Sequence, residues 1–510
     1  METSVQAPER SEHGLKKDAI GFLDGLIIGI ASTAPAYSLA AVLAIVVVTV
    51  GVQAPAVLLT AFVPMFLIAS AFYYMNRADP DCGTTFSWVT RAMGPSLGWV
   101  GGWAVCTTGI IVIGSLADVG AFYIFDILGL DGLRDSKAAV TIFAIVIIGV
   151  MTWICVLGTE LSAHVQRFLI GAQVVALLIF AGVALVKVAA NDAPAGAIDP
   201  KLSWFSPFAV DSLSLLVLGL LTGVFIYWGW ESAVNLNEET HDSNTAPGLA
   251  AVASTVILLV TYVAVTTAIV AFAGLDKIAE FEDDTALFGA VADEVLGTGL
   301  SWIVVLAIIT SAIASTQTTI LPASRTSLSM ARQGAYPEPL GRVHPRYLTP
   351  HVSTIAIGVI AAVWYGVLNS TSQNFLFDSL TSLSLMIAFY YALTGLACAI
   401  YYRHELTKSV KNFLFIGVGP VIGSLILGYL FYKAIVEYAK VDDSYSGSQA
   451  FGVAIPVVLG LGLLLLGVVL MLAWRAAGHG NFFGRHTETV DPDVAAGRKA
   501  GVAAVPEEAV

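Results

Sequence analysis

Residues 25–37 read GLIIGIASTAPAY, an apolar run that belongs to a membrane helix but is interrupted near its middle, and this stretch decides the fold. Pro35 donates no backbone hydrogen bond and clashes with the preceding helical turn. The residue before it, Ala34, is pushed away from helical angles. Polar Ser32 and Thr33 lie beside the same point. The pattern therefore predicts a helix that is broken within the membrane.

A second interruption lies in residues 225–235, FIYWGWESAVN, which carry Gly229 and Glu231 inside another apolar segment. A single proline kink or Gly–Trp pair is commonly only packing. These two interruptions, however, are five predicted helices apart, where the paired breaks of a five-plus-five inverted repeat fall. Broken helices in such transporters bind substrate and ion near the bilayer midplane.

Composition places most of the chain in a membrane. Hydrophobic residues make up 57% of the 510 residues and charged residues 12%, about half the roughly 25% charged residues of an average soluble protein. This composition excludes a soluble enzyme, a disordered protein and a nucleic-acid binder. We predict an all-α polytopic membrane protein with twelve transmembrane helices, near residues 19–49, 54–75, 97–128, 138–157, 166–190, 212–235, 247–273, 298–325, 351–368, 375–402, 413–438 and 451–474.

The distribution of Lys and Arg predicts the orientation. Most of the 24 basic residues fall in the two tails and in the loops on the same side of the predicted membrane. The positive-inside rule then places both termini in the cytoplasm and the protein in the plasma membrane. The predicted divisions are an N-terminal tail (1–18), a first repeat (19–200), a second repeat (201–403), two added helices (404–475) and a C-terminal tail (476–510).

Four stretches resemble the amino acid–polyamine–organocation (APC) superfamily of secondary transporters. They are Pro80-Asp-Cys-Gly83 running on to Gly94-Pro-Ser-Leu-Gly98 and Trp103, Gly158 to Gln166, Gly229-Trp-Glu-Ser-Ala233 with Glu238 and Glu239, and Ser324-Arg325 running through Met330-Ala-Arg-Gln-Gly334 to Thr349-Pro350. The resemblance implies a leucine-transporter-type fold, in which ten helices form two inverted repeats and two further helices are added.

The resemblance also implies the substrate site. Phe225 falls where some relatives keep an aromatic gate, and Glu231 where they keep a glutamate suspected of carrying a proton. The residues carried over as substrate-binding are Ser32, Thr33, Ala34, Tyr37, Phe225, Trp228, Gly229, Glu231 and Thr319.

Charged and hydroxyl residues suggest how such a site would be gated and coupled. Glu238, Glu239, Arg325 and Arg332 fall at the predicted cytoplasmic mouth, where we expect a salt-bridged gate. Coupling to H⁺ through Glu231 is favoured, and Na⁺ bound by the hydroxyl run at 311–319 is the alternative. No cofactor or metal site is predicted, since the four cysteines lack metal-binding spacing.

The sequence leaves the roles of two further features open. Asp118 is interpreted either as a structural carboxylate or as a group that attracts cations to an outer vestibule. Tyr390 and Tyr391 reach the central cavity if their helix faces it.

We predict a secondary transporter of amino acids or related organic amines that works by alternating access. Gln173 stands where some relatives carry a lysine, so a lysine-based proton mechanism is not expected. Ala34-Pro35-Ala36 stands where the resembled family has Gly-Ser-Gly, which binds a carboxylate. Because of this difference and the acids Asp118 and Glu231, a polyamine or potassium importer is an alternative, and a non-transporting nutrient receptor is a weaker one. An enzyme is not expected, because no nucleophile–base pair or phosphate loop is present. The expected partners are a small-molecule substrate and the lipid bilayer, and the oligomeric state is not predicted.

Overall fold

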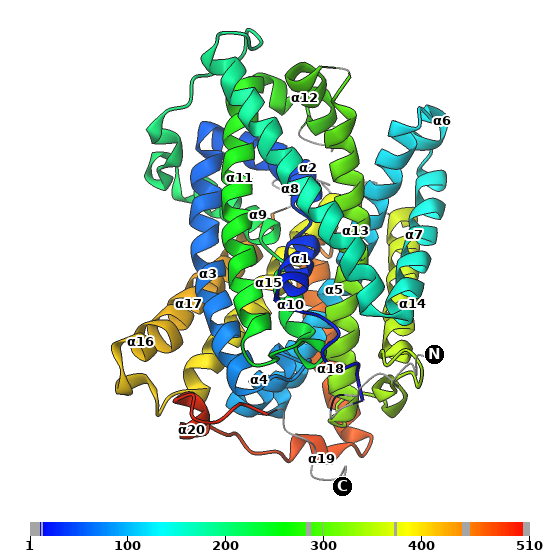
Figure 1. Cartoon of the computed structure of the whole chain (residues 1–510), viewed down its shortest axis with the longest axis vertical. Coiled ribbons are helices and arrows are strands. Elements are labelled where there is room, and N and C mark those ends of the chain that lie inside the picture. The colour runs from blue at the N-terminus through cyan, green and yellow to red at the C-terminus, as the bar shows by residue number, and fades with distance from the viewer. Residues whose placement is uncertain are drawn as a thin grey trace, which may run out of the picture.

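Apolar helices run along the long axis of the computed structural model, and most of the connecting segments gather at its two ends (Figure 1). The structure describes residues 11, 14–281, 287–297, 299–371, 375–440 and 449–502, without the side chains of 159–165, 371 and 375–377. The predicted tails at 1–18 and 476–510 lie partly outside these residues, and most side chains of the stretch quoted from Gly158 to Gln166 are outside the description.

Thirteen longer helices make up the bundle in the described part of the chain. They are α1 (Phe22–Thr33), α2 (Pro35–Val50), α3 (Ala54–Ala78), α5 (Pro95–Ile127), α7 (Lys137–Leu157), α8 (Thr159–Ala189), α9 (Leu213–Ile226), α11 (Ala246–Ala279), α13 (Trp302–Arg332), α14 (His351–Thr371), α15 (Phe375–Tyr401), α17 (Gly419–Glu437) and α18 (Ile455–Ala476). Helices α7 and α9 start at Ser136 and Ser212, whose hydroxyls accept a hydrogen bond from the first turn, the usual N-cap arrangement.

Short elements connect and cap these helices. The short α-helices are α4 (Thr85–Met93), α6 (Asp131–Arg134), α10 (Ser232–Asn235), α12 (Leu287–Leu296), α16 (Val410–Asn412), α19 (Gly480–Phe483) and α20 (Pro492–Ala495). The 3₁₀-helices are η1 (Gly51–Gln53), η2 (Leu202–Phe205), η3 (Pro207–Ala209), η4 (Asn237–Glu239), η5 (Glu338–Gly341) and η6 (Leu406–Lys408). The π-helix is η7 (Phe413–Val418). Strands β1 (Gln449–Ala450) and β2 (Val453–Ala454) form an antiparallel hairpin.

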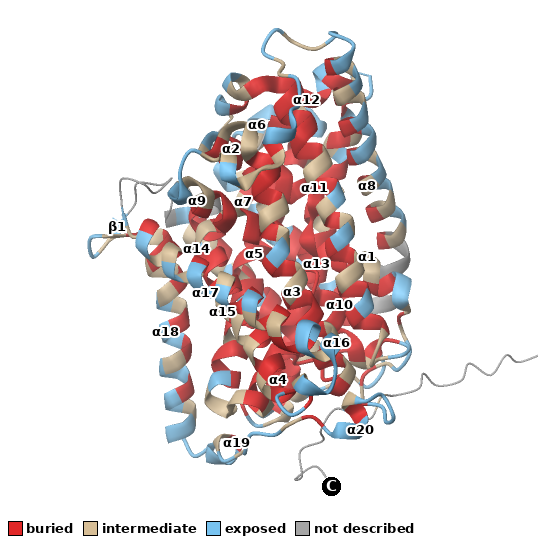
Figure 2. Cartoon of the chain, turned by 90° about the vertical axis from the view of Figure 1, so that its left-hand side faces the viewer, coloured by how far each residue is buried: buried red, intermediate tan, exposed pale blue. Residues whose placement is uncertain are grey.

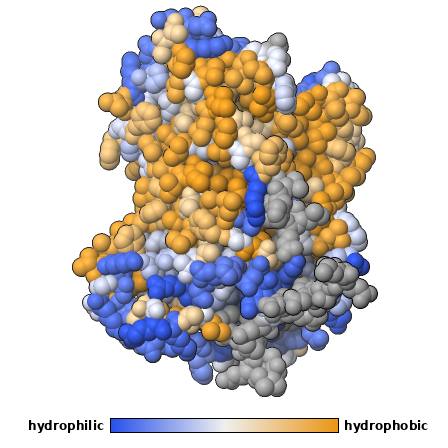
Figure 3. Space-filling view, in the orientation of Figure 1, coloured by the Kyte–Doolittle hydropathy of each residue, from blue (hydrophilic) through white to orange (hydrophobic). Residues whose placement is uncertain are grey.

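Ten helical stretches among the described residues are long and apolar enough to cross a membrane. One of them, Phe22–Ala78, contains α1, α2 and α3, and α9 is shorter than a full span. The predicted count of twelve therefore stays a prediction. An apolar belt separates two hydrophilic ends on the surface of the molecule (Figure 3), as expected for a multi-pass membrane protein.

Burial divides the helices into an inner and an outer group (Figure 2). The spans that contain α1–α3, α5, α11, α13 and α15 are 67–72% buried, whereas those of α7, α8, α14, α17 and α18 are 33–39% buried. Polar residues on the inner group are therefore shielded from lipid by other helices. Helices α6 and α12 lie at one end of the bundle and α4, α19 and α20 at the other (Figure 1); we call these the α6 end and the α4 end.

Candidate functional site

The first predicted break lies between α1 and α2, where Ala34 alone separates the two helices. Ala34 has φ 49° and ψ 61°, the left-handed conformation that residues with a side chain rarely adopt. Its N–H donates to the Ala31 carbonyl at 3.0 Å and closes the end of α1. Pro35 then starts α2, where its fixed φ suits the first helical turn.

Hydroxyl groups satisfy the last carbonyls of α1. Ser38 Oγ donates to the Thr33 carbonyl at 2.7 Å. Ser315 Oγ, from α13, donates to the Ser32 carbonyl at 2.9 Å. The C-terminal end of a helix carries partial negative charge, so this end of α1 is suited to accept a cationic group in place of the hydroxyls.

The second predicted break follows α9, and it contacts the first directly. The chain leaves the helix at Ile226, turns through residues 227–231 and resumes as α10. Gly229 has φ +118°, and a Cβ there would lie 2.6 Å from the Ser32 carbonyl oxygen. Ser32 Oγ and Ser232 Oγ are 2.6 Å apart. The structure thus brings together two interruptions that are about 200 residues apart in sequence.

Replacing Gly229 with alanine is expected to force the two breaks apart. The added Cβ would overlap the Ser32 carbonyl, and the backbone angle would be strained, at roughly 1–3 kcal/mol for each effect. Thermal unfolding of the purified variant should show a clear loss of stability, with loss of substrate binding. Gly171→Ala is the matched control, because nothing lies within 4 Å of its added Cβ. Equal stability of the two variants would contradict the close contact.

Glu231 is buried beside the second break and hydrogen-bonded on both oxygens. Tyr390 donates to Oε1 and Tyr391 to Oε2, each at 2.5 Å, and the Gly229 N–H also donates to Oε2 at 3.1 Å. The Trp228 indole N–H donates to the Tyr390 hydroxyl. The carboxylate is therefore linked through Tyr390 to the indole of Trp228.

A small cavity lies between the two breaks. Its unfilled space is about 200 Å³, of which the part wide enough to hold water has room for only about one molecule, so the cavity is closed to a substrate in this conformation. The lining residues are Ser32, Thr33, Ala34, Tyr37, Ser38, Val112, Leu116, Phe225, Trp228 and Ser315.

Six of the nine predicted substrate residues line this cavity and three do not. Gly229 and Glu231 lie behind it in the second break. Thr319 faces α5, where a Cβ on Gly109 would lie 3.8 Å from its methyl group. Ser38, Val112, Leu116 and Ser315 were not predicted. Their contribution depends on which faces of α2, α5 and α13 turn inward, and a uniformly apolar sequence does not show this.

A second cavity lies on the other side of Phe225. Its unfilled space is about 330 Å³, and its walls come from α2, α9, α15 and the residue after α17. Phe225 lines both cavities. The role of aromatic gate that the family resemblance implies for Phe225 stays a prediction.

Two ion pairs lie toward the α4 end. Arg325 contacts Glu239 through Nε and Nη2, both at 2.8 Å from Oε1, and the two side chains are 0% and 1% exposed. Arg332 contacts Glu238 at 3.1 Å. The structure thus brings together all four residues of the predicted gate, each arginine from α13 and each glutamate from η4.

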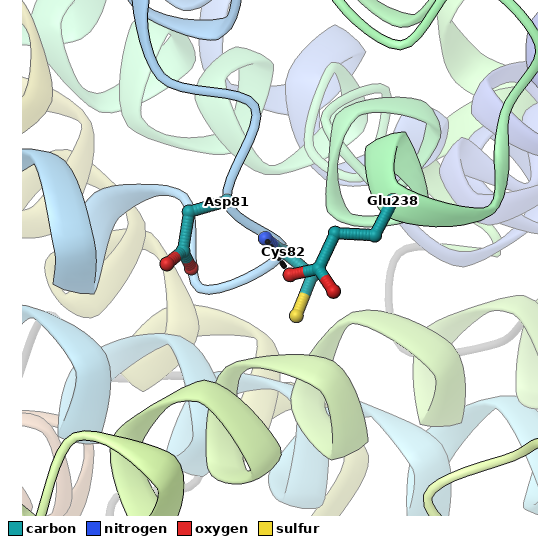
Figure 4. Close-up of side chains that lie close together, drawn as sticks. All are labelled: Asp81, Cys82 and Glu238. Carbon is teal, nitrogen blue, oxygen red and sulfur yellow. Dashed lines mark hydrogen bonds between the residues drawn. The ribbon is translucent and has the colours of Figure 1, made fainter. Parts of the chain in front are cut away.

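Asp81, Cys82 and Glu238 lie close enough to suggest a metal site (Figure 4). Their hydrogen bonds point to a structural role. Asp81 Oδ1 accepts from the Gly83 N–H, Ser87 and Ser329, each at 2.7 Å. Glu238 accepts from the Cys82 N–H at 3.1 Å and from Arg332. Burial, reinforced by Glu238, raises the pKa of the Cys82 thiol, which disfavours the thiolate that a metal would need.

Comparison with known sequences supports a transporter. A family model described as amino acid permease matches residues 25–461. An uncharacterised transporter of Mycobacterium tuberculosis is 26% identical over 347 residues, which cover 67% of this chain and 72% of the relative. The low-affinity putrescine importer PlaP of Escherichia coli is 21% identical over 427 residues, which cover 81% and 83%.

Comparison with solved structures supports the fold. The crystal structure of MhsT in complex with L-phenylalanine matches with a TM-score of 0.56 and 14% identity, covering 80% of this chain and 98% of MhsT. The predicted fold class is thus confirmed as a helical membrane protein with a leucine-transporter-like neighbour, and the APC resemblance is confirmed by the family match. The chain belongs to the amino acid permease family.

Proposed function

We propose that the protein is a secondary active transporter of amino acids or related organic amines, and that substrate binds between the two breaks. The observation that carries this proposal is the direct contact of the breaks, Gly229 against Ser32, beside a closed cavity. Buried ion pairs lie on one side of this cavity and Phe225 on the other. Opening these two barriers in turn is what alternating access requires.

The finer architecture is part of the same proposal. The ten candidate spans become twelve when Phe22–Ala78 is read as two spans and α9 with α10 as one broken span. The first ten form the two repeats, 19–200 and 201–403, and α17 and α18 are added outside. We place the α4 end and both termini in the cytoplasm of a plasma-membrane protein, on the basis of the Lys and Arg distribution.

The cavity favours an ammonium group over a carboxylate. The carbonyl end of α1 faces Ser38 and Ser315, which are both cavity-lining residues. At the start of α2, Pro35 has no N–H, and the Tyr37 N–H already donates to Ser311. The substrate amine would therefore replace the hydroxyls at the end of α1, and the indole of Trp228 would add a cation–π contact of about 0.5–2 kcal/mol.

Proton coupling through Glu231 is the mechanism we favour. Sodium is the alternative, through the hydroxyls of α13. Two of these hydroxyls already have partners, because Ser315 donates to the Ser32 carbonyl and Ser311 accepts from Gln173 at 3.0 Å. Ser315 keeps its oxygen lone pairs while it donates, and the Thr319 hydroxyl has no hydrogen-bond partner among the described residues, so sodium stays the alternative.

Transport by purified protein in liposomes tests the proposal. We expect radiolabelled amino acids or polyamines to accumulate several-fold above protein-free liposomes when the inside is alkaline, and not without the pH gradient. Rubidium uptake in place of amines would support the potassium alternative. Binding of an amine in thermal-shift assays without accumulation under any gradient would support a receptor and contradict the proposal.

A further inference from the structure

One carboxylate within the bundle belongs to neither break. Asp118, in α5, is partly exposed and is not a lining residue of the central cavity. The hydroxyl of Tyr365, in α14, donates to Asp118 Oδ1. Ionisable groups at membrane depth are expensive to bury and usually mark a pathway for ions or protons.

A ladder of polar side chains leads from Asp118 toward the α6 end. Asn369, one helical turn beyond Tyr365, donates from Nδ2 to the Tyr365 hydroxyl at 3.3 Å and to Thr141 Oγ1 at 2.9 Å. Thr141 lies in the second turn of α7 and is partly exposed. Helix α7 starts next to α6, so the ladder ends near the surface at the α6 end (Figure 1).

Tyr37 connects Asp118 to the central cavity. The Tyr37 side chain lines the cavity, and its hydroxyl is buried without a hydrogen bond to any described residue. The hydroxyl lies beside Ser115 and within electrostatic reach of Asp118, one turn further along α5.

We propose that Asp118 is a second proton-binding site, which exchanges protons with water that enters from the α6 end beside the polar side chains of Tyr365, Asn369 and Thr141. The proton adds to a carboxylate oxygen and converts the ion to a neutral acid, and release reverses this step without breaking any other covalent bond. The charge state of Asp118 acts on the substrate cavity through Tyr37. This last effect rests on the proposed transport function, whereas proton binding does not.

The groups that face Asp118 come from three helices. Tyr365 contacts it from α14, Tyr37 lies near it from α2, and Lys137 acts from α7 at longer range. Tyr365 donates to the carboxylate and therefore favours its ionised form, as does the positive charge of Lys137. Removing the Tyr365 hydroxyl is thus the cleanest way to change proton binding while leaving the carboxyl in place.

Carbodiimide labelling tests the site directly, because dicyclohexylcarbodiimide adds to protonated carboxyls in apolar surroundings. The full-length protein in detergent is labelled between pH 5 and pH 9, and the adducts are located by peptide mass spectrometry. We expect Asp118 labelling to fall at least tenfold from pH 5 to pH 9. Asp126, on the same helix but with a side chain that is 36% exposed and paired with Arg134, is the control and should stay unlabelled. Asp118 labelling that is absent, or that does not change with pH, would overturn the proposal.

Tyr365→Phe separates proton binding from a structural role. Loss of a hydrogen bond to an ionised group should move the midpoint of Asp118 labelling upward by about one pH unit. A structural hydroxyl would leave the midpoint unchanged, and that result would count against the proposal. In liposomes, Asp118→Asn should flatten the dependence of uptake on outside pH, and an unchanged profile would overturn the link to the cavity. If the wild type transports nothing, the proposed function fails while the labelling result still decides the proton site.

Discussion

Replacing Glu231 with glutamine is expected to abolish accumulation driven by a pH gradient while preserving exchange of substrate across the membrane. Glutamine has nearly the same volume and can keep the contacts of this buried side chain, because tyrosine hydroxyls both donate and accept hydrogen bonds. It cannot bind and release a proton. Accumulation should therefore fall to the level of protein-free liposomes, whereas exchange should change by no more than about tenfold, the equivalent of one lost hydrogen bond.

The surroundings of Glu231 make this separation measurable. Tyr390 joins the carboxylate to the Trp228 indole, which lines the cavity. Loss or gain of the charge would therefore alter the contact that fixes the indole, so that proton binding and substrate binding are coupled through hydrogen bonds. Tyr390→Phe breaks this link while leaving Glu231 able to titrate, and it should weaken coupling without abolishing it.

Counterflow and gradient-driven uptake are measured side by side for the Glu231→Gln variant. Glu437→Gln is the matched control, because Glu437 is held by Lys433 and Lys440 at the end of α17, away from both breaks. An equal loss of exchange and accumulation in Glu231→Gln would mean that the carboxylate only braces the second break. Full gradient-driven uptake would exclude Glu231 as the coupling group.

Local sequence signals predicted the breaks well, because the causes are local. Pro35 and Gly229 act on their own turn of backbone, so their effect is visible without knowing the rest of the fold. The contact between Gly229 and Ser32 is a tertiary property, and only the spacing of five helices hinted at it. The short helix α4 was missed, since no helix was predicted between the spans near 54–75 and 97–128.

The site was predicted only in part, because the sequence does not show which face of each helix turns toward the cavity. Glu231 was expected in the cavity but turns toward Tyr390 and Tyr391, and Thr319 turns toward α5. On helices that are buried all round, an amphipathic pattern is absent and cannot show which face turns inward. The positions of charged residues were easier to predict, because buried charges must pair. The predicted gate residues form two ion pairs, although the sequence did not show which arginine pairs with which glutamate.

Removing Arg325 is expected to open the α4 end of the molecule. Arg325→Met removes one member of a buried ion pair, at a cost of about 3–5 kcal/mol to the closed state. The closed-to-open ratio should then fall by more than ~100-fold. The double variant with Glu239→Met removes both charges and should recover much of the closed state, since an apolar pair of similar size avoids the unpaired charge.

Cys82 reports this opening without an introduced cysteine. Its side chain is fully buried, and its thiol lies 3.6 Å from the Arg325 carbonyl oxygen. Maleimide labelling followed by peptide mass spectrometry compares it with Cys106, Cys155 and Cys398, which are also buried. Opening of the gate exposes Cys82 alone, whereas global unfolding exposes all four cysteines, so a folding defect cannot be mistaken for gating.

The size of the effect depends on burial, and a second arginine on the same molecule shows this. Arg134 pairs with Asp126, Asp131 and Asp135 at the α6 end, but these side chains are 28–69% exposed. Exposed pairs contribute about 0–1 kcal/mol, so Arg134→Met should leave Cys82 labelling unchanged. If Arg325→Met also leaves Cys82 protected, the buried pair does not hold the α4 end closed, and the gate must be sought among the apolar contacts around Leu15 and Leu328.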